Sequence, residues 1–557
     1  MGVSLLKLLK FNIILLSIII LLGLFLRVYK LDTVPPGLTW DEAALGYNAY
    51  SISQTLRDEY GNFLPLTLRS FGDYKPALYA YLIIPFMLVL GLNEFAVRLP
   101  SVFAGLGLII ITYLLVKHIF KNTWLSLSAA FFMAISPISI QFSRAGWESN
   151  VAVFLNVTGI YFFLKALQKP KYFIFSAIML SLSLICYQAS KMFVPIILVG
   201  LFIFFRKEVK QSRQFLIGLT LLTTSLIIIF TSTFILGQSN RLAAQNYFAY
   251  QRPDERINTI ISEGHLRGDL QYEFLHGEWW SFLAGTFERY LVYFSPELLF
   301  IEGDYSPRHS VPDLGILNIY ALLLIPFGFY LLWRRNEPER RIIFFLLFAA
   351  AIPAVLSRDL ISMVRALNLV FPLVILEAFG FYFLVNKLSG VLHVRKIITT
   401  AVFSLFVFVN LGIFLDFYFI HMPKEHSSDW LYGYKQILKE LPSDLAKYKR
   451  VVFTDDYGQP YIYYLFYSKY SPAAFQNQAI LEQATVDVGT VRNIDNIEFR
   501  PINWPGDRGL ENTLFIGTGI EIPDADIVTE KKSKKLTEIE FPDGKPAFKI
   551  VENGYNE

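Results

Sequence analysis

An acid pair close to the first apolar segment is the strongest candidate for chemistry. Asp41 and Glu42 stand in the stretch Thr39-Trp-Asp-Glu. A carboxylate held at a membrane surface could act as a general base that removes the proton of an attacking hydroxyl group. The same stretch matches a capping box, in which Thr39 is the N-cap residue and Glu42 reaches back to its amide. Because the capping box accounts for Thr39 and Glu42, Asp41 is the better candidate for the base.

A lysine in an unusual position is the second candidate. Lys75 directly precedes Pro76, and proline is favoured in the first turn of a helix, so we expect Lys75 at the positive end of a helix. A cation there is unfavourable unless the lysine and the helix end bind the same anion, such as a phosphate group. The alternative is a lysine that only reaches toward lipid headgroups.

Other polar residues are expected on the same side of the membrane as this pair. Taken singly, anchoring at the interface explains each of them, but several cations around an acid pair favour a binding site. As further ligands of a phosphate group we expect Arg98, Arg308, His309 and Arg365. As other substrate-binding residues we expect Asp73, Tyr74, Arg144, Glu148 and Lys191.

The composition is that of a membrane protein. Of 557 residues, 54% are hydrophobic and 17% are charged, and the mean hydropathy is +0.43. About a quarter of the residues in a soluble globular protein are charged, so most of this chain is built for lipid. The net charge of +4 does not indicate a nucleic-acid partner. A single cysteine, Cys186, excludes disulfides within the chain and cysteine metal clusters.

Eleven apolar segments are interpreted as membrane spans, each of which needs about 17–25 residues. They lie near residues 11–28, 96–117, 124–142, 150–167, 172–188, 192–206, 214–236, 314–333, 341–357, 366–386 and 397–420. The first span follows two lysines, as a signal peptide would, but no small-residue cleavage site comes after it, and we expect it to be retained. Segment 75–92 is interpreted as a helix at the interface.

Charge decides the orientation. With a cytoplasmic N-terminus and segment 75–92 at the interface, the basic clusters near 117–121, 165–171, 206–213, 334–341 and 387–396 all lie in the cytoplasm. The positive-inside rule requires this arrangement, and it would be reversed if segment 75–92 crossed. A first loop (29–95) with the acid pair, a second large loop (237–313) and all residues after about 421 are then extracytoplasmic.

The last part of the chain changes character. Residues 424–557 are hydrophilic, with strands predicted at 450–453 and 514–519 and an aromatic helix or another strand at 459–467. We therefore expect a transmembrane domain over residues 1–423 and a small extracytoplasmic α/β domain after it. Nucleotide sugars and ATP are cytoplasmic, and no GxxxxGK[ST] phosphate loop is present, so chemistry outside requires a membrane-borne donor.

Three motifs in a fixed order resemble one group of enzymes. WDEAALGYNAY, GDYKPALYAYL and NEFAVRLPS follow the first span. In this order they are similar to motifs of the GT-C-fold glycosyltransferases, most of all the relatives of protein O-mannosyltransferases and lipid A aminoarabinose transferases. The likeness is strongest over about residues 25–120, while RHS at 308–310 and RALNLVFP from 365 also look like features of bacterial members.

The resemblance implies a multi-span GT-C enzyme that moves one sugar from a polyprenyl-phosphate carrier to a hydroxyl group of a protein, lipid or glycan acceptor. It implies Asp41 as the catalytic base and Lys75 near the donor phosphate. In the aminoarabinose branch an acid directly precedes this lysine, whereas here Tyr74 does and Asp73 is one residue further back, so the role of that acid is not carried over. Some members use a divalent metal ion, for which this sequence shows no clear ligand set.

The expected chemistry suits these residues. Because a polyprenyl phosphate is a good leaving group, the protein must supply a base for the hydroxyl and cations for the charge that grows on the phosphate. Asp41 would take the proton while the oxygen attacks the anomeric carbon from the opposite face, with inversion. Glu42 would orient Asp41, bind the acceptor or only cap the helix.

Alternatives from other classes remain. A transporter or flippase of lipid-linked substrates should carry ionisable groups and broken helices at mid-membrane, whereas the charges here gather at one interface. An oligosaccharyltransferase or glycan polymerase would move preassembled chains, but the WWD-type motif of the former is absent, since Glu278-Trp-Trp-Ser has no acid after the tryptophans. A non-catalytic relative that binds glycans is a further alternative.

Overall fold

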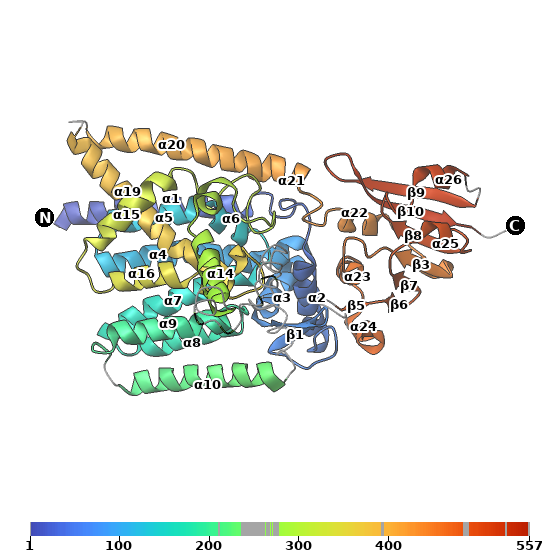
Figure 1. Ribbon diagram of the computed structural model, residues 1–557, viewed down its shortest axis with the longest axis horizontal. Coiled ribbons are helices and arrows are strands. Elements are labelled where there is room, and N and C mark those ends of the chain that lie inside the picture. The colour runs from blue at the N-terminus through green and yellow to red at the C-terminus, as the bar shows by residue number, and fades with distance from the viewer. Residues whose placement is uncertain are drawn as a thin grey trace.

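The computed structural model describes residues 2–209, 212–235, 278–391, 395–482, 489–529 and 532–554, with a few single positions between 262 and 270. Most of the predicted second loop, 237–313, up to residue 277 therefore lies outside the described residues. A bundle of helices occupies one end of the elongated molecule and a β-sheet the other (Figure 1).

Apolar helices build the bundle, and their hydrophobic runs explain why they pack there rather than in water. The longer ones are α1 (Gly2–Val28), α4 (Glu94–Phe120), α7 (Glu148–Gln168), α10 (Arg213–Ile235), α19 (Val370–Val391) and α20 (Lys396–Asp416). The shorter ones are α5 (Thr123–Ile135), α6 (Pro137–Ser143), α8 (Tyr172–Leu184), α9 (Ser190–Phe205), α14 (Glu278–Val292), α15 (Ala321–Trp333), α16 (Arg340–Ala349), α17 (Ile352–Val355), α18 (Met363–Ala366) and α21 (Met422–Glu425). Short irregular helices η3 (Glu297–Ile301), η4 (Leu367–Leu369) and η5 (Phe417–His421) interrupt them.

Six helical segments among the described residues are long and apolar enough to cross a membrane, and the pair α5–α6, bent by 58°, would be a seventh. The chain is therefore a multi-pass membrane protein. Helices α8, α9 and α15 are apolar but have only 13, 16 and 13 residues. The predicted span 341–357 is divided between α16 and α17. The total of eleven spans stays a prediction.

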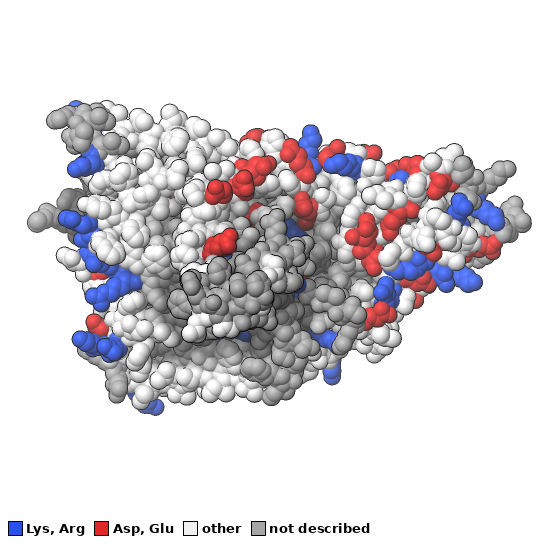
Figure 2. All heavy atoms as spheres, in the orientation of Figure 1, with Lys and Arg blue, Asp and Glu red and all other residues white. Residues whose placement is uncertain are grey.

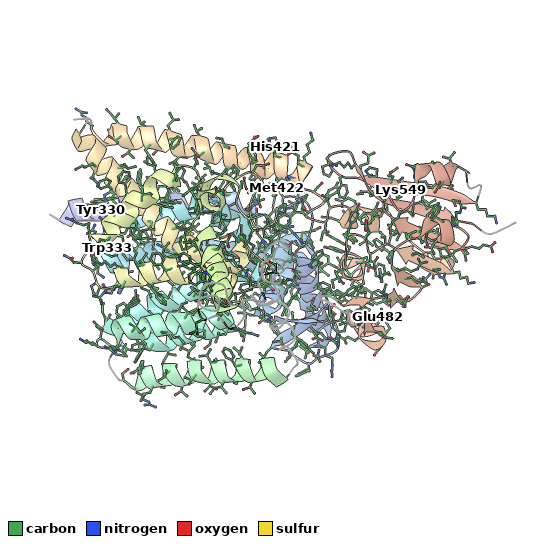
Figure 3. All side chains as sticks on the ribbon, viewed as in Figure 1. Tyr330, Trp333, His421, Met422, Glu482 and Lys549 are labelled. Carbon is green, nitrogen blue, oxygen red and sulfur yellow. The ribbon has the colours of Figure 1, made fainter. Side chains whose placement is uncertain are left out.

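Charge and aromatic rings mark the two ends of the bundle. Lysine and arginine side chains gather at the end away from the β-sheet, and the side of the bundle is mostly uncharged (Figure 2). The exposed rings of Tyr330 and Trp333 lie toward the same far end, whereas His421 and Met422 lie where α20 leads to the sheet (Figure 3). Aromatic rings of this kind are enriched at membrane interfaces.

The first loop folds against the opposite end of the bundle, between the helices and the sheet (Figure 1). It contains α2 (Trp40–Thr55), the antiparallel strands β1 (Thr67–Ser70) and β2 (Asp73–Pro76), and α3 (Leu78–Leu90). The 13 residues of α3 rise about 20 Å, less than the hydrocarbon core of a bilayer at about 30 Å. The expectation that Pro76 starts this helix was wrong: Lys75 and Pro76 end a strand, and α3 begins after Ala77.

The C-terminal part is a mixed sheet with short helices. Its six strands lie in the order β6-β7-β3-β8-β10-β9, and β3 is parallel to both β7 and β8. The strands are β3 (Arg450–Phe453), β6 (Asn493–Ile494), β7 (Ile497–Phe499), β8 (Thr513–Gly517), β9 (Ser533–Glu540) and β10 (Pro546–Asn553), and a separate pair is β4 (Leu481–Glu482) and β5 (Thr490–Val491). The helices are α22 (Tyr434–Lys439), η6 (Leu445–Lys447), α23 (Pro460–Ser468), α24 (Pro472–Gln478), α25 (Trp504–Asp507) and α26 (Asp524–Thr529).

The strands predicted at 450–453 and 514–519 are present, and residues 459–467 take the helical alternative as α23. A domain boundary at residue 423 stays a prediction. One apolar core joins the first loop, before this residue, to the sheet after it. Buried side chains of α2 and α3, such as Tyr47 and Tyr79, belong to the same cluster as Phe466 and Phe548. Burying each such side chain contributes about 1.5–3 kcal/mol.

Gly46 permits the closest contact in this shared core. A Cβ atom at Gly46 would lie 2.5 Å from the ring of Phe466 on α23 and 2.8 Å from Val97 on α4. Only a residue without a side chain lets α2 lie this close to both helices. The C-terminal part therefore packs directly on the helix that begins with the acid pair.

Candidate active site

The acid pair opens helix α2, and its capping box forms as predicted. The hydroxyl oxygen of Thr39 accepts a hydrogen bond from the amide of Glu42 at 3.2 Å. The carboxylate of Glu42 accepts one in return from the amide of Thr39 at 3.0 Å. These bonds satisfy two of the amides that a helix start leaves without partners.

Glu42 also forms a buried ion pair. Its Oε1 accepts hydrogen bonds from Nε of Arg98 at 3.0 Å and from the amide of Gly146 at 2.8 Å. Its side chain is only 3% exposed. With both carboxylate oxygens engaged, Glu42 is suited to hold the start of α2 in place and poorly suited to take a proton from a substrate.

Arg98 contacts other parts of the protein, although we expected it to bind a phosphate group. Its fully buried guanidinium donates to Glu42 and to the carbonyls of Leu31 at 2.8 Å, Pro35 at 3.1 Å and Gly37 at 2.5 Å. Four N–H groups of Arg98 thus fasten the beginning of the first loop to α4. This arrangement argues against the predicted role of Arg98 as a phosphate ligand.

Arg144 fastens the same stretch of chain from the other side. It is fully buried and donates to the carbonyls of Leu26 at 2.9 Å, Tyr29 at 2.7 Å and Val34 at 2.8 Å. Its guanidinium also lies 4.8 Å from the ring of Phe419. A substrate contact, which we expected of Arg144, therefore does not fit its burial.

A third buried arginine was not expected from the sequence. Arg27, at the end of α1, donates to the hydroxyl oxygens of Ser143 at 3.1 Å and Ser139 at 2.8 Å and to the carbonyl of Ala134 at 3.0 Å. In the sequence Arg27 falls within segment 11–28, the predicted first span, and carried no prediction of its own. The bend between α5 and α6 leaves carbonyl groups without helical partners there, and Arg27 satisfies them.

Asp41 is the more exposed acid of the pair, and it contacts Lys75. The Nζ atom of Lys75 donates to Oδ1 of Asp41 and forms an ion pair between β2 and the first turn of α2. The side chain of Asp41 is 39% exposed and that of Lys75 is 12% exposed. Lys75 also lies 4.9 Å from the ring of Phe71. The structure thus brings together the predicted base and the predicted phosphate-binding lysine.

Arg308 contacts the residue that begins α2, Trp40. Its guanidinium lies 4.9 Å from the ring of Trp40, the residue directly before Asp41. The carbonyl of Arg308 accepts a hydrogen bond from Gln141 at 2.9 Å, which fixes this loop on α6. A second cation from a distant part of the chain therefore lies at the same helix start. Trp40 itself was not among the expected residues, because an aromatic residue at an interface has no specific signal.

His309 and Arg365 belong to a neighbouring polar network. Nδ1 of His309 lies 3.3 Å from Oδ2 of the buried Asp304, which also accepts from the amide of Met363 at 2.7 Å. Arg365 forms an ion pair with Asp359 and donates to the hydroxyl of Ser357 at 3.2 Å. The bond from Met363 joins the loop before α15 to the start of α18, and the contacts of Arg365 hold α18 on the loop that precedes it. The predicted phosphate role of His309 and Arg365 stays a prediction.

The remaining expected residues lie around the first loop. Asp73 begins β2, and its side chain is outside the described part of the chain. The carbonyl of Tyr74 accepts from Gln188 at 2.9 Å, and the carbonyl of Glu148 accepts from the Cys186 thiol at 3.4 Å. Lys191 lines a small hollow of about 20 Å³ with residues that include Pro76. A substrate contact of these residues stays a prediction.

A buried acid behind the site gave no signal in the sequence. Glu59 is fully buried, and its carboxylate accepts a hydrogen bond from Asn48 at 3.2 Å. Asn48 lies on α2, two turns after Asp41. Burial raises the pKa of Glu59 to about 8, against the opposing effects of Asn48 and the positive charge of Lys75. Glu59 is therefore mostly protonated at neutral pH and fastens the loop after α2 to that helix.

The described residues do not fit a divalent metal ion. No group of three or more histidine, cysteine, aspartate or glutamate side chains that could hold a metal occurs among them. The two acids of the motif each pair with a basic side chain, Asp41 with Lys75 and Glu42 with Arg98. We therefore derive no catalytic step through a metal.

Part of the chain is similar in sequence to known proteins. The profile of the family described as dolichyl-phosphate-mannose-protein mannosyltransferase matches residues 74–233, which include Lys75 but not Asp41. The proposed mannosyltransferase YkcB of Bacillus subtilis (strain 168) is 29% identical over 165 residues, 28% of this chain. The matched part spans 21% of YkcB, about a fifth of its length.

Solved structures match over much more of the chain. The apo structure of ArnT from Cupriavidus metallidurans is 11% identical, with a TM-score of 0.51, and covers 97% of this chain and 97% of its own. The oligosaccharyltransferase AglB from Archaeoglobus fulgidus is 15% identical, with a TM-score of 0.49, over 82% of this chain and 64% of its own. Through ArnT, most of the chain is similar in fold to a solved GT-C structure. In sequence over residues 74–233, and in fold over most of its length, the chain is thus similar to GT-C glycosyltransferases, which include the mannosyltransferase family.

Proposed function

We propose that this protein is an inverting glycosyltransferase that moves one monosaccharide from a polyprenyl-phosphate carrier to an acceptor hydroxyl group. The observation that carries the proposal is the ion pair of Asp41 and Lys75 at the start of α2. In this pair a solvent-accessible carboxylate and a cation are in direct contact. The reaction needs both, a base for the acceptor hydroxyl and a positive charge for the departing phosphate. The family that matches residues 74–233 is named for a dolichyl-phosphate-mannose donor, which supports a lipid phosphate sugar.

In the proposed reaction the lipid phosphate replaces Asp41 as the partner of Lys75. Asp41 then takes the proton of the acceptor hydroxyl, whose oxygen attacks the anomeric carbon. The bond from that carbon to the phosphate oxygen breaks, and its electron pair stays on the phosphate, which gains one negative charge. Lys75 stabilises this charge, and Arg308, beside Trp40, is the second cation that can approach it. Attack and departure on opposite faces invert the anomeric centre.

We also propose that the site faces the extracytoplasmic side. The basic end of the bundle lies away from the C-terminal sheet (Figure 2), as expected if that end is cytoplasmic. The first loop, the site and the C-terminal sheet then lie outside, with an N-terminus inside and eleven spans. On that side a lipid-linked sugar is the available activated donor.

A transfer assay with purified protein tests the proposal. The protein is placed in lipid nanodiscs with radiolabelled polyprenyl-phosphate mannose, glucose or arabinose and an extract of membrane acceptors. We expect label to move from the lipid to an acceptor and polyprenyl phosphate to be released in equal amount. A parallel assay in sealed vesicles tests the alternative: movement of label between the leaflets, with the donor intact and no transfer, would make the protein a flippase.

A further inference from the structure

Glu94 connects the C-terminal part of the chain to the bundle. It lies in the first turn of α4 and is only 6% exposed. Its carboxylate forms an ion pair with Lys435 on α22 at 2.6 Å and accepts a hydrogen bond from the hydroxyl of Tyr467 on α23 at 3.1 Å. A buried carboxylate needs such partners, so Glu94 requires the C-terminal helices to be seated on α4.

The next turn of α4 holds the start of α2. Arg98 follows Glu94 by four residues and pairs with Glu42 in the capping box at 3.0 Å. A row of charged side chains therefore leads from the C-terminal part to the catalytic turn, with one ion pair at each end, Lys435 with Glu94 and Arg98 with Glu42. The negative charges of Glu94 and Glu42 both act on the buried guanidinium of Arg98, which links the two pairs.

Direct contacts between α23 and α2 run beside this row. The hydroxyl of Tyr463 donates to the carbonyl of Leu38, the residue before the N-cap Thr39, at 2.9 Å. At the other side of the helix start, the ring of Phe466 occupies the space that a side chain at Gly46 would fill. The polypeptide on each side of Asp41 therefore contacts the C-terminal part.

We propose that Glu94 is a positioning residue that couples the seating of the C-terminal helices to the place of Asp41 in the active site. Loss of the Lys435 contact loosens α22 and α23 on α4, and the capping turn of α2 loses its fixed position. The donor phosphate is bound mainly by side chains outside this row, so the loss falls on the chemical step. This inference rests on the proposed function.

The test compares Lys435→Met with Lys435→Arg, which keeps the charge, and with Lys535→Met, which removes two exposed ion pairs from strand β9 of the C-terminal sheet. Amide hydrogen exchange of residues 38–46 and steady-state kinetics are measured for each protein. We expect Lys435→Met to speed exchange in α2 and to lower kcat about tenfold while the donor KM stays within about threefold. Lys435→Arg should restore most of both, and Lys535→Met should match the wild type.

Two results overturn the inference. One is wild-type exchange in residues 38–46 in Lys435→Met, and the other is a kcat that Lys435→Arg fails to restore at all. Glu94→Gln and Tyr467→Phe repeat the comparison at the other two residues of this contact. If the buried Glu94→Gln variant does not fold, the Lys435 variants still test the inference, because the side chain of Lys435 is 32% exposed. If the wild type transfers no sugar, the proposed function fails, and the exchange data alone still decide whether the C-terminal seating controls α2.

Discussion

Lys75 and Asp41, 34 residues apart in the sequence, form an ion pair that joins strand β2 to the start of helix α2. In this state the positive charge of Lys75 holds the carboxylate that we propose as the base. Binding of a lipid phosphate would offer Lys75 a second anion and release Asp41 for the acceptor hydroxyl. The pair therefore connects donor binding to the availability of the base.

Replacing Lys75 with methionine should impair both donor binding and turnover. The variant loses the cation that stabilises the phosphate, so we expect the donor KM to rise and kcat to fall, each by about tenfold or more. Initial rates at varied donor concentration measure both. Lys75→Arg, which keeps the charge, should lie between the variant and the wild type, and unchanged kinetics in Lys75→Met would remove Lys75 from the donor site.

Two buried or half-buried arginines should respond differently. Arg308→Gln removes a cation beside Trp40, and we expect a rise of about tenfold in donor KM with little change in melting temperature. Arg144→Gln leaves three carbonyls, of Leu26 at the end of α1 and of Tyr29 and Val34 in the first loop, without their donor, and we expect a clear loss of thermal stability. Melting curves in detergent and donor titrations separate the two effects, and the opposite assignment would contradict the site.

The two acids of the motif should also separate. Glu42→Gln leaves the fully buried Arg98 without its ion-pair partner, and breaking a buried pair of this kind costs about 3–5 kcal/mol. We therefore expect a large drop in melting temperature for Glu42→Gln and a small one for Asp41→Asn. Differential scanning fluorimetry of both variants gives the comparison. Equal stability of the two would mean that the Arg98 pair does not hold α2.

The pH dependence of stability should contain a contribution from Glu59. Its pKa is raised by burial to about 8 in the folded protein. The unfolded chain ionises this group near pH 4.3, so folding stability is full below that pH and declines as pH rises toward 8. Glu59→Gln should flatten this decline and melt a few degrees higher than the wild type at pH 8. A lower melting temperature for Glu59→Gln at pH 8 would contradict the assignment.

Local patterns in the sequence predict much of this arrangement. The capping box at Thr39 and Glu42 follows from residue spacing along one helix turn, and the strand at 450–453 follows from an apolar run bounded by turn residues. The juxtaposition of Asp41, Lys75 and Arg308 depends on how three separate segments fold together. The sequence alone places these three charged residues on one side of the membrane. Their grouping in one site was suggested by the resemblance of the motifs to those of GT-C glycosyltransferases.

Two buried arginines show why the role of a site residue is hard to predict from sequence. Arg98 and Arg144 stand at the ends of apolar segments, where a sequence cannot distinguish an arginine that faces a phosphate from one that caps carbonyls. Their roles depend on the irregular stretch from Leu26 to Gly37, whose free carbonyls need donors. The same limit hid Glu59, because its burial comes from neighbours distant in sequence.

The most direct test of the central claim is sugar transfer by Asp41→Asn. Wild type and variant are purified in nanodiscs, compared for folding by melting temperature, and incubated with labelled polyprenyl-phosphate sugar and acceptor. We expect a folded variant that still binds the donor but has lost transfer by about a hundredfold or more. A folded Asp41→Asn protein with wild-type transfer would show that Asp41 is not the base and would contradict the proposed mechanism.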